Sequence, residues 1–480
     1  MSESFVYELP IVTNPMEENQ LFTRFNVARL IYNACLQEAL RRLNLAKQSK
    51  LWQEGRNTPP GEKKSALFRE ALKLYHFSEY ELHGYVKDLA KESWLKEHVD
   101  STVAQKIASR AFQSTNEYRV GNRGKPRFKT IRQFSSVEGK SNVAGIRFKN
   151  GSIYWMGMVL KLIYDPCDEV EKHALHHKTK YVRLVRRIVR EKVRYFAQLV
   201  LEGKPLIKKK HRVGTAIVGL DIGPSTLAAM SEESAFLIPL NPKAPKKQKK
   251  LQRALDRSLR KANPDNYNEK GTPKKNVKWK KSARYKKKSK KLAEEKRKEA
   301  GERKRRRGEI TNQILSMGNT IKTEKLSYKS FQKQYGRSVA RHAPGSMVQT
   351  LRLKAANAGG EVIEFSCYKT KLSQSCHNCN QIKKKALSER WHVCSCGINP
   401  VQRDLYSSFL AIHVEDEVLN RPKAVEAWAC AEPLMKQALF KCEQAAKGKE
   451  RFASFGFSQR QSCSPVKAGS MQDKAGDVVR

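Results

Sequence analysis

The chain has 480 residues, with 95 Lys and Arg against 47 Asp and Glu, so its formal net charge is +48. A compact fold with this excess repels itself, and its usual partner is nucleic acid, whose phosphates release counterions when Lys and Arg replace them. Hydrophobic residues make up 39% of the chain, which excludes a purely disordered basic tail.

The sequence shows no sign of a membrane span or a secretory signal. It has no run of about 18 apolar residues, and its first residues, MSESFVYELPIVTNP, lack a basic segment followed by an apolar one. We therefore expect an intracellular protein in a reducing compartment, with no membrane partner. There, cysteines in close pairs indicate metal ligands rather than a disulfide framework.

The N-terminal half predicts a strand, a set of helices and then a β domain. Residues 4–12, SFVYELPIV, are typical of a strand, and residues 19–46 repeat apolar residues at helical spacing. From Gly121 onward, alternating β-branched and aromatic residues with Gly turns predict antiparallel strands that carry Arg and Lys on one face. Such strands either form a nucleic-acid platform or cover a core, and the pattern alone leaves both open.

Residues 213–231, VGTAIVGLDIGPSTLAAMS, predict a buried strand, a turn and a partner strand. Asp221 stands at the end of the first apolar run. An aspartate there is costly to desolvate unless a partner pairs with it, and a divalent cation does so best. A turn-capping role is the alternative.

Residues 271–310 hold 19 Lys and Arg against 5 Glu, with helix formers throughout the last part. A solvated linker and a nuclear-import-like signal are alternatives, but inside a basic chain the run is expected to lie along a phosphate backbone. A short strand that carries Glu324 follows, then a helix that ends at Gly359 and Gly360, then a further strand. Glu361 and Glu364 on that further strand are alternatives to Glu324 as a site residue.

The cysteine pattern is the most specific local signal in the chain. Cys376 and Cys379 are separated by two residues, fourteen residues follow, and Cys394 and Cys396 are separated by one. Four thiolates satisfy a tetrahedral Zn²⁺, and two short knuckles joined by a hairpin form a zinc ribbon. His377 and His392 are possible substitute ligands.

After the ribbon, Asp404 is expected to open an amphipathic helix. An RNase H-like sheet would bring Asp221, Glu324 and Asp404 to one edge, where three carboxylates hold two Mg²⁺ ions for phosphodiester hydrolysis. The neighbouring Arg403 would contact the scissile phosphate or pair with an acid, and the sequence favours neither.

The order of these motifs resembles one protein family. The segments GLDIGPST, TIKTEKL and RLKAANAGGEVIEF, the split zinc ribbon and VQRDLYSSF follow one another as in the RuvC domain of transposon-encoded TnpB proteins, relatives of compact type V CRISPR effectors. LFTRFNVARLIYNACLQEAL and GKPRFK are similar to TnpB recognition and wedge segments, so the likeness covers about residues 1 to 412.

The resemblance implies an RNA-guided DNA endonuclease. A guide RNA from the transposon end would pair with one strand of a double-stranded target DNA, next to a short flanking motif that the protein recognises. The resemblance also implies a cytoplasmic, nucleoid-associated prokaryotic protein, and it leaves the oligomeric state open. The site residues that it implies are Asp221, Glu324 and Asp404 for two catalytic Mg²⁺, Cys376, Cys379, Cys394 and Cys396 for one structural Zn²⁺, and Lys125, Arg127, Lys129 and Arg403 for nucleic acid.

Two positions depart from the family pattern. Tyr406 stands where Asn is common, and the lone Ser395 replaces a two-residue spacer. Neither changes the three acids, so we expect altered local geometry rather than lost activity.

Three other functions remain as alternatives. An RNA-guided DNA-binding protein without cleavage predicts the loss of an acid, and none is lost. A stand-alone transposase or accessory protein needs its own strand-transfer nucleophile. A compact type V CRISPR effector has the same chemistry, and only its gene neighbourhood separates it.

The fold class expected is multidomain α+β, with a helical recognition lobe and an antiparallel β wedge followed by an RNase H-like (RuvC) α/β domain with an inserted zinc ribbon. The expected order is a first wedge strand (1–20), the helical recognition domain (21–120), the β wedge (121–210), the first part of the RuvC-like domain (211–370) with a basic helical insertion (242–310), the ribbon (371–400), the final RuvC-like helix (401–415) and a partly disordered tail (416–480). Residues 415–446, most of them in this tail, are compatible with helix.

Overall fold

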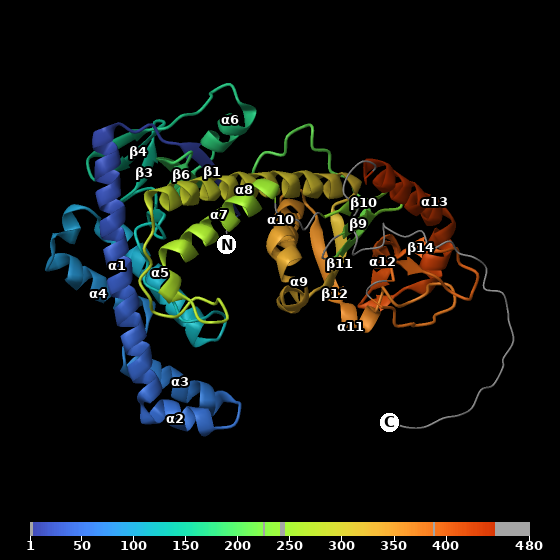
Figure 1. Ribbon diagram of the computed structural model, residues 1–480, viewed down its shortest axis with the longest axis horizontal. Coiled ribbons are helices and arrows are strands. Elements are labelled where there is room, and N and C mark those ends of the chain that lie inside the picture. The colour runs from blue at the N-terminus through green and yellow to red at the C-terminus, as the bar shows by residue number, and fades with distance from the viewer. Residues whose placement is uncertain (1–2, 224–225, 241–244, 387–388, 447–480) are drawn as a thin grey trace. The chain divides into compact units, whose positions relative to one another are not determined.

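The computed structural model describes residues 3–223, 226–240, 245–386 and 389–446 (Figure 1). The chain forms two compact units, Met1–Lys208 and Lys209–Arg480. It is a mixed α+β protein with several sheets and a cluster of four cysteines. Among the described residues, no helix combines the length and the apolar character that a membrane span needs.

The first unit begins with a strand and a group of helices. The long helix α1 starts where the Asn14 side chain accepts a hydrogen bond from the Glu17 N–H and the Glu17 carboxylate accepts one from the Asn14 N–H, a capping box. The predicted strand and helix at this end are confirmed. The elements are β1 (Ser4–Pro10), α1 (Pro15–Gln48), α2 (Lys50–Asn57), α3 (Glu62–Leu74), α4 (Glu79–Lys91), a 3₁₀ turn (Trp94–Glu97) and α5 (Ser101–Arg119).

Two antiparallel sheets complete this unit. One has the order β1-β7-β6-β2 and the other β3-β4-β5. Apolar residues of α1, α4 and α5 share one core with those of the sheets, so the helices and strands of this unit are packed together. The elements are β2 (Ser136–Glu138), β3 (Arg147–Lys149), β4 (Ser152–Trp155), β5 (Met158–Lys161), α6 (Glu169–His176), β6 (Thr179–Val189) and β7 (Lys192–Glu202).

The second unit is built on a five-stranded mixed sheet of order β10-β9-β8-β11-β12 (Figure 1). β8 pairs antiparallel with β9 and parallel with β11, and β11 pairs parallel with β12. The strand, turn and partner strand expected around Asp221 are β8 and β9. The strands are β8 (Ile217–Ile222), β9 (Thr226–Met230), β10 (Ala235–Pro239), β11 (Thr320–Lys325) and β12 (Glu361–Ser366).

Helices cover both faces of this sheet because its strands are apolar on both sides. Leu227 and Ala229 pack with α8 and α10, whereas Ala228 and Met230, which alternate with them, pack with α12 and α13. The helices of the sheet domain are α8 (Ala283–Met317), α9 (Tyr328–His342), α10 (Pro344–Asn357), α11 (Cys367–Thr370), α12 (Arg403–Ile412) and α13 (Arg421–Ala446).

The basic insertion is helical in part: two helices are separated by a 3₁₀ turn and by residues 267–282, which form no helix. α7 (Lys246–Ala262) packs on α8, where Lys247 pairs with Glu295 at 2.7 Å, and a 3₁₀ turn (Pro264–Asn266) follows α7. The remaining short strands are β13 (Trp391–His392), β14 (Val401–Gln402), β15 (Val414–Glu415) and β16 (Val418–Leu419).

The segment after residue 415 is folded as far as residue 446. Ala424, Ala431, Met435 and Ala438 of α13 are buried in one core with α12, so this helix is part of the second unit. Residues 447–480 of the expected tail, with Cys463, lie outside the described residues.

Candidate metal and carboxylate site

Three acids come from three elements of the second unit. Asp221 lies near the end of β8, Glu324 near the end of β11, and Asp404 is the second residue of α12. In the parallel pairing of β8 and β11, Thr323 lies opposite Leu220, so the next residues, Glu324 and Asp221, follow at the same edge on the same face. Glu324 thus occupies the strand position predicted from the sequence.

The close approach of α12 to β8 depends on a glycine. A Cβ atom on Gly219 would lie 1.9 Å from the carbonyl oxygen of Ser408, a distance that no packed side chain tolerates. Only glycine therefore lets the helix lie against this strand. This contact brings Asp404 to the edge where Asp221 lies.

Asp404 and Glu324 act electrostatically on Asp221, although among the described residues only the four cysteines bring three or more ligand atoms within 4.8 Å of one another. Burial raises the pKa of the Asp221 carboxyl well above its ordinary value, and the negative charges of Asp404 and Glu324 raise it further. Arg403 and Arg390 act in the opposite direction. Burial also raises the pKa of Glu324 to about 7, against a hydrogen bond from the backbone of Leu372. A cluster of like charges in partial burial favours a bound cation.

Asp404 is held by side chains that the sequence did not single out. The residue is 5% exposed, and its Oδ2 accepts a hydrogen bond of 2.6 Å from the Thr226 hydroxyl. Its Oδ1 lies 3.5 Å from Arg390 Nη1. The one sequence signal for Thr226 is its position at the start of the strand that follows Asp221. Nothing in the sequence distinguishes Arg390 from its basic neighbours.

Arg403 pairs with an acid, one of the two roles considered from the sequence. Its Nε lies 3.8 Å from Asp404 Oδ1, and its Nη1 donates to the carbonyl oxygen of Ala386 at 3.1 Å. The residue is 8% exposed. Its guanidinium therefore contributes positive charge to the carboxylate cluster from a fixed position.

The alternative glutamates on β12 lie elsewhere. Glu364 forms an ion pair of 2.5 Å with Arg352 of α10, and Glu361 is exposed at the start of the strand. Glu364 lies opposite Thr323 in the pairing of β11 with β12, so it is on the other face from Glu324. Among Glu324, Glu361 and Glu364, only Glu324 raises the pKa of Asp221 through its charge.

The four cysteines of the predicted ribbon come together. The Sγ atoms of Cys376 and Cys396 are 3.6 Å apart, those of Cys379 and Cys394 are 3.3 Å apart, and all four lie within 4.8 Å of one another. Tetrahedral Zn–S bonds of about 2.3 Å place sulfur atoms about 3.8 Å apart. The donor set and the spacing therefore fit a structural zinc ion.

The two histidines considered as substitute zinc ligands contact a tyrosine instead. The His377 N–H and Nδ1 lie 2.9 and 2.8 Å from the Tyr406 hydroxyl, and the His392 ring stacks on the Tyr406 ring at 4.3 Å. Burial lowers the pKa of both histidines to about 4, so they are neutral. Tyr406, the residue that departs from the family pattern, thus joins the first cysteine knuckle to the helix of Asp404.

The expected nucleic-acid residues Lys125, Arg127 and Lys129 belong to the first unit, whereas the carboxylates belong to the second. Lys125 and Arg127 are exposed. The backbone of Lys129 is fixed by Asn33 of α1, whose side chain accepts from its N–H at 2.8 Å and donates to its carbonyl oxygen at 3.0 Å. The segment therefore presents exposed cations from an anchored backbone.

Comparison with known proteins finds likeness only among solved structures. No protein-family model matches the chain, and no curated protein matches it. The chain is similar to Cas12f1 in the cryo-EM structure of a Cas12f1–sgRNA–target DNA complex, with 14% identity and a TM-score of 0.43, over 86% of this chain and 98% of that chain. It is also similar to a chain of a CRISPR-Cas12f ternary complex, with 14% identity and a TM-score of 0.27, over 82% of this chain and 81% of that chain.

Proposed function

We propose that this protein is an RNA-guided DNA endonuclease of the TnpB type, which hydrolyses both target strands in one RNase H-like (RuvC) site. The observation that best supports the proposal is that Asp221 and Glu324 lie at the same edge of two paired strands, and that Asp404 and Glu324 both act electrostatically on Asp221. They come from a first strand, a later strand and a helix, as an RNase H-like site requires.

The three carboxylates are the residues that would hold the catalytic Mg²⁺ ions. Their mutual repulsion and partial burial fit this role because a hard divalent cation binds carboxylate oxygens and offsets their charge. When bound, Mg²⁺ lowers the pKa of the attacking water and stabilises the leaving oxygen. The chain itself orients Asp404 through Thr226 and supplies counter-charge through Arg390.

The guide and the target are inferred from charge and from the sequence motifs. A net charge of +48 requires a polyanionic partner, and the order of motifs is similar to that of TnpB. A guide RNA from the transposon end and a double-stranded target with a flanking motif are the partners proposed. The exposed Lys125 and Arg127 are candidate phosphate contacts, and the four cysteines supply a structural Zn²⁺ site.

The test begins with protein purified from cells that carry its native locus. Any bound RNA is sequenced, and the complex is offered a library of target plasmids with Mg²⁺. We expect one specific RNA species and cleavage next to one short motif. Asp221→Ala and Asp404→Ala should abolish cleavage and leave binding of guide and target intact, because each removes a carboxylate of the cluster.

Glu364→Gln is the matched control, since it removes an acid from the neighbouring strand that lies outside the cluster. It should cut like the wild type. Cleavage at the wild-type rate by either aspartate variant would refute the site, and cleavage without RNA would refute guidance. Specific binding without any cleavage by the wild type would favour an RNA-guided DNA-binding protein.

A further inference from the structure

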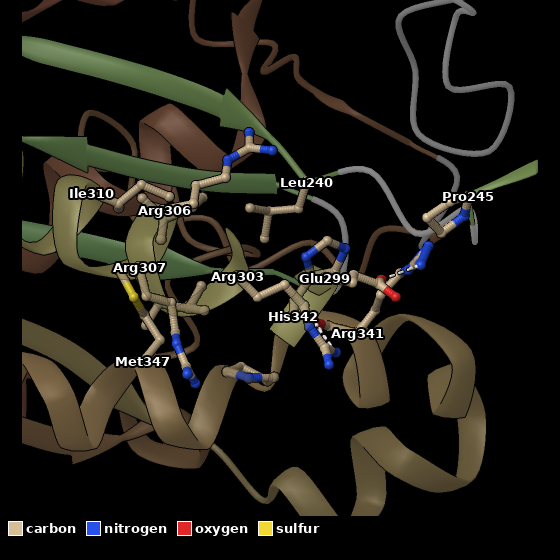
Figure 2. A pocket seen from close by; sticks show the side chains of 13 residues that line it. Leu240, Pro245, Glu299, Arg303, Arg306, Arg307, Ile310, Arg341, His342 and Met347 are labelled. Atoms are coloured by element: carbon tan, nitrogen blue, oxygen red, sulfur yellow. Dashed lines mark hydrogen bonds and ion pairs between the residues drawn. The ribbon is translucent and has the colours of Figure 1, made fainter. Parts of the chain in front are cut away.

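A cavity lies on the face of the sheet opposite α12. Its apolar lining comes from β8, β9, the residue after β10 and the helices α8 and α10, and Figure 2 shows arginines of α8 and α9 around it. Ile222, which directly follows Asp221 on β8, lines it, and successive strand residues point to opposite faces. The cavity is therefore separate from the carboxylate site. Its apolar residues are Ile222, Leu227, Leu240, Ile310 and Met347.

The lining is strongly positive. Arg303, Arg306, Arg307 and Arg341 line the cavity together with one carboxylate, Glu299, which pairs with Arg341 at 2.5 Å. Arg303 donates to the carbonyl oxygens of Ala340 and Arg341 at 3.2 and 3.1 Å, and such neutral acceptors fix a guanidinium without cancelling its charge. An anionic ligand would be attracted to this lining.

Two hydrogen-bonding features also favour an anionic ligand. The Nε of Arg307 is shielded from solvent and has no hydrogen-bond partner among the described residues, and a buried donor of this kind is costly unless it is satisfied. Helix α10 begins at the cavity wall with Pro344, and its N-cap residue Ala343 provides no capping side chain. Uncapped helix N-termini favour anions.

The geometry points to a nucleotide-binding site in which the arginines take the phosphate and the apolar floor takes the base. Guanidinium groups bind phosphate through paired hydrogen bonds and stack on flat rings. A bare anion would leave the apolar floor unused. A water needs about 10–15 Å³ of space, and the cavity has a volume of about 210 Å³.

A nucleotide fits this chain better than an acyl anion because a net charge of +48 favours nucleic-acid partners, an argument that rests on the proposed function. The ligand would be either a free mononucleotide or the phosphorylated end of a nucleic-acid strand, which share the same chemistry. The site goes beyond the proposed nuclease function, since its occupancy does not require that the carboxylates cut DNA.

The test uses full-length protein and a fluorescently labelled AMP, followed by anisotropy at a salt concentration high enough to suppress non-specific binding. We expect a Kd below about 1 mM, with inorganic phosphate and adenosine each displacing the probe more weakly than unlabelled AMP. Arg307→Gln should weaken AMP binding about tenfold or more, because it removes a charge-assisted hydrogen bond. Arg306→Gln, at the exposed rim, should weaken it less.

Arg305→Gln is the matched control. It removes the same charge from the same helix, but Arg305 is exposed and pairs with Glu302 and Glu309. It should bind AMP as the wild type does, and thermal melting checks that all variants are folded. Stronger displacement by a 5′-phosphorylated oligonucleotide than by its 5′-hydroxyl form would identify a strand end as the ligand, and equal displacement would identify a free nucleotide.

Three results would overturn the assignment. They are the absence of AMP binding to the wild type, an equal loss in Arg305→Gln and Arg307→Gln, and displacement of the probe by oleate but not by AMP. Because the readout is binding, these results are independent of whether guided cleavage occurs.

Discussion

The Tyr406 hydroxyl lies 2.9 Å from the backbone N–H of His377 and 2.8 Å from its Nδ1. It accepts the first hydrogen bond and shares the second with the ring nitrogen. His377 follows Cys376, the first cysteine of the cluster, and Tyr406 comes two residues after Asp404. The cysteine cluster and the carboxylate helix are therefore one folded assembly.

Tyr406→Phe should destabilise this assembly. The change leaves the buried His377 N–H and Nδ1 without their partner, which costs about 1–3 kcal/mol. Thermal unfolding should occur at a lower temperature, and zinc should be released to a chelator faster. Tyr368→Phe is the control, because Tyr368 is 83% exposed, and it should behave as the wild type. Equal melting of the two variants would contradict the coupling.

Cys376→Ser should lose zinc. Cys376 is the most buried of the four cysteines and lies 3.6 Å from Cys396, and three thiolates hold zinc more weakly than four. Metal analysis should show a reduced zinc content, with a lower melting temperature for the second unit. Cys430→Ser, an exposed cysteine outside the cluster, should keep its zinc. Full zinc content in the Cys376 variant would argue against the ribbon.

Thr226→Val should slow cleavage without unfolding the sheet. Valine keeps the shape of threonine but removes the 2.6 Å hydrogen bond to Asp404. Hydrogen bonds to charged groups contribute about 1.5–3 kcal/mol, so we expect the single-turnover rate to fall by about tenfold or more. Thr323→Val is the control, since its hydroxyl donates to the Leu220 carbonyl oxygen. It should lower stability and leave the rate largely unchanged.

Glu324→Gln should abolish cleavage and yet stabilise the magnesium-free protein at high pH. The pKa of Glu324 is about 7 in the folded protein, above its ordinary value of 4.5, so the folded state binds this proton more tightly than the unfolded state. The contribution of Glu324 to the free energy of unfolding is therefore fully present below about pH 4.5. It is lost as the pH rises through 7. Glutamine stays neutral and avoids that loss.

Chemical unfolding at several pH values, without added magnesium, measures the difference. The variant should exceed the wild type by up to about 3 kcal/mol at pH 8 and match it near pH 4.5. A chelator is avoided because it would remove zinc. Glu364→Gln should show no such gain, because Glu364 is paired with Arg352. A Glu324→Gln variant less stable than the wild type at pH 8 would contradict the burial of a charged carboxylate.

The sequence by itself determined the local features of this protein. Alternating and helical periodicity predicted the strands around Asp221 and Glu324 and the helix opened by Asp404, and the structure confirms them. The cysteine spacing predicted a cluster that the structure also contains. These features follow from residues that are close in the chain, so a local pattern is enough to indicate them. The catalytic roles of the acids and the nucleic-acid contacts stay predictions.

Only the tertiary structure decided which distant residues meet. Arg390 and Thr226 reach Asp404 from separate elements, and Gly219 matters only because α12 crosses β8 there. The arginine-lined cavity joins β8, β9, α8 and α9, and its lining residues on these elements extend along the chain from Ile222 to Arg341. No local pattern encodes such contacts, because they depend on how the apolar faces of the sheet and helices pack, and that packing involves the whole unit at once.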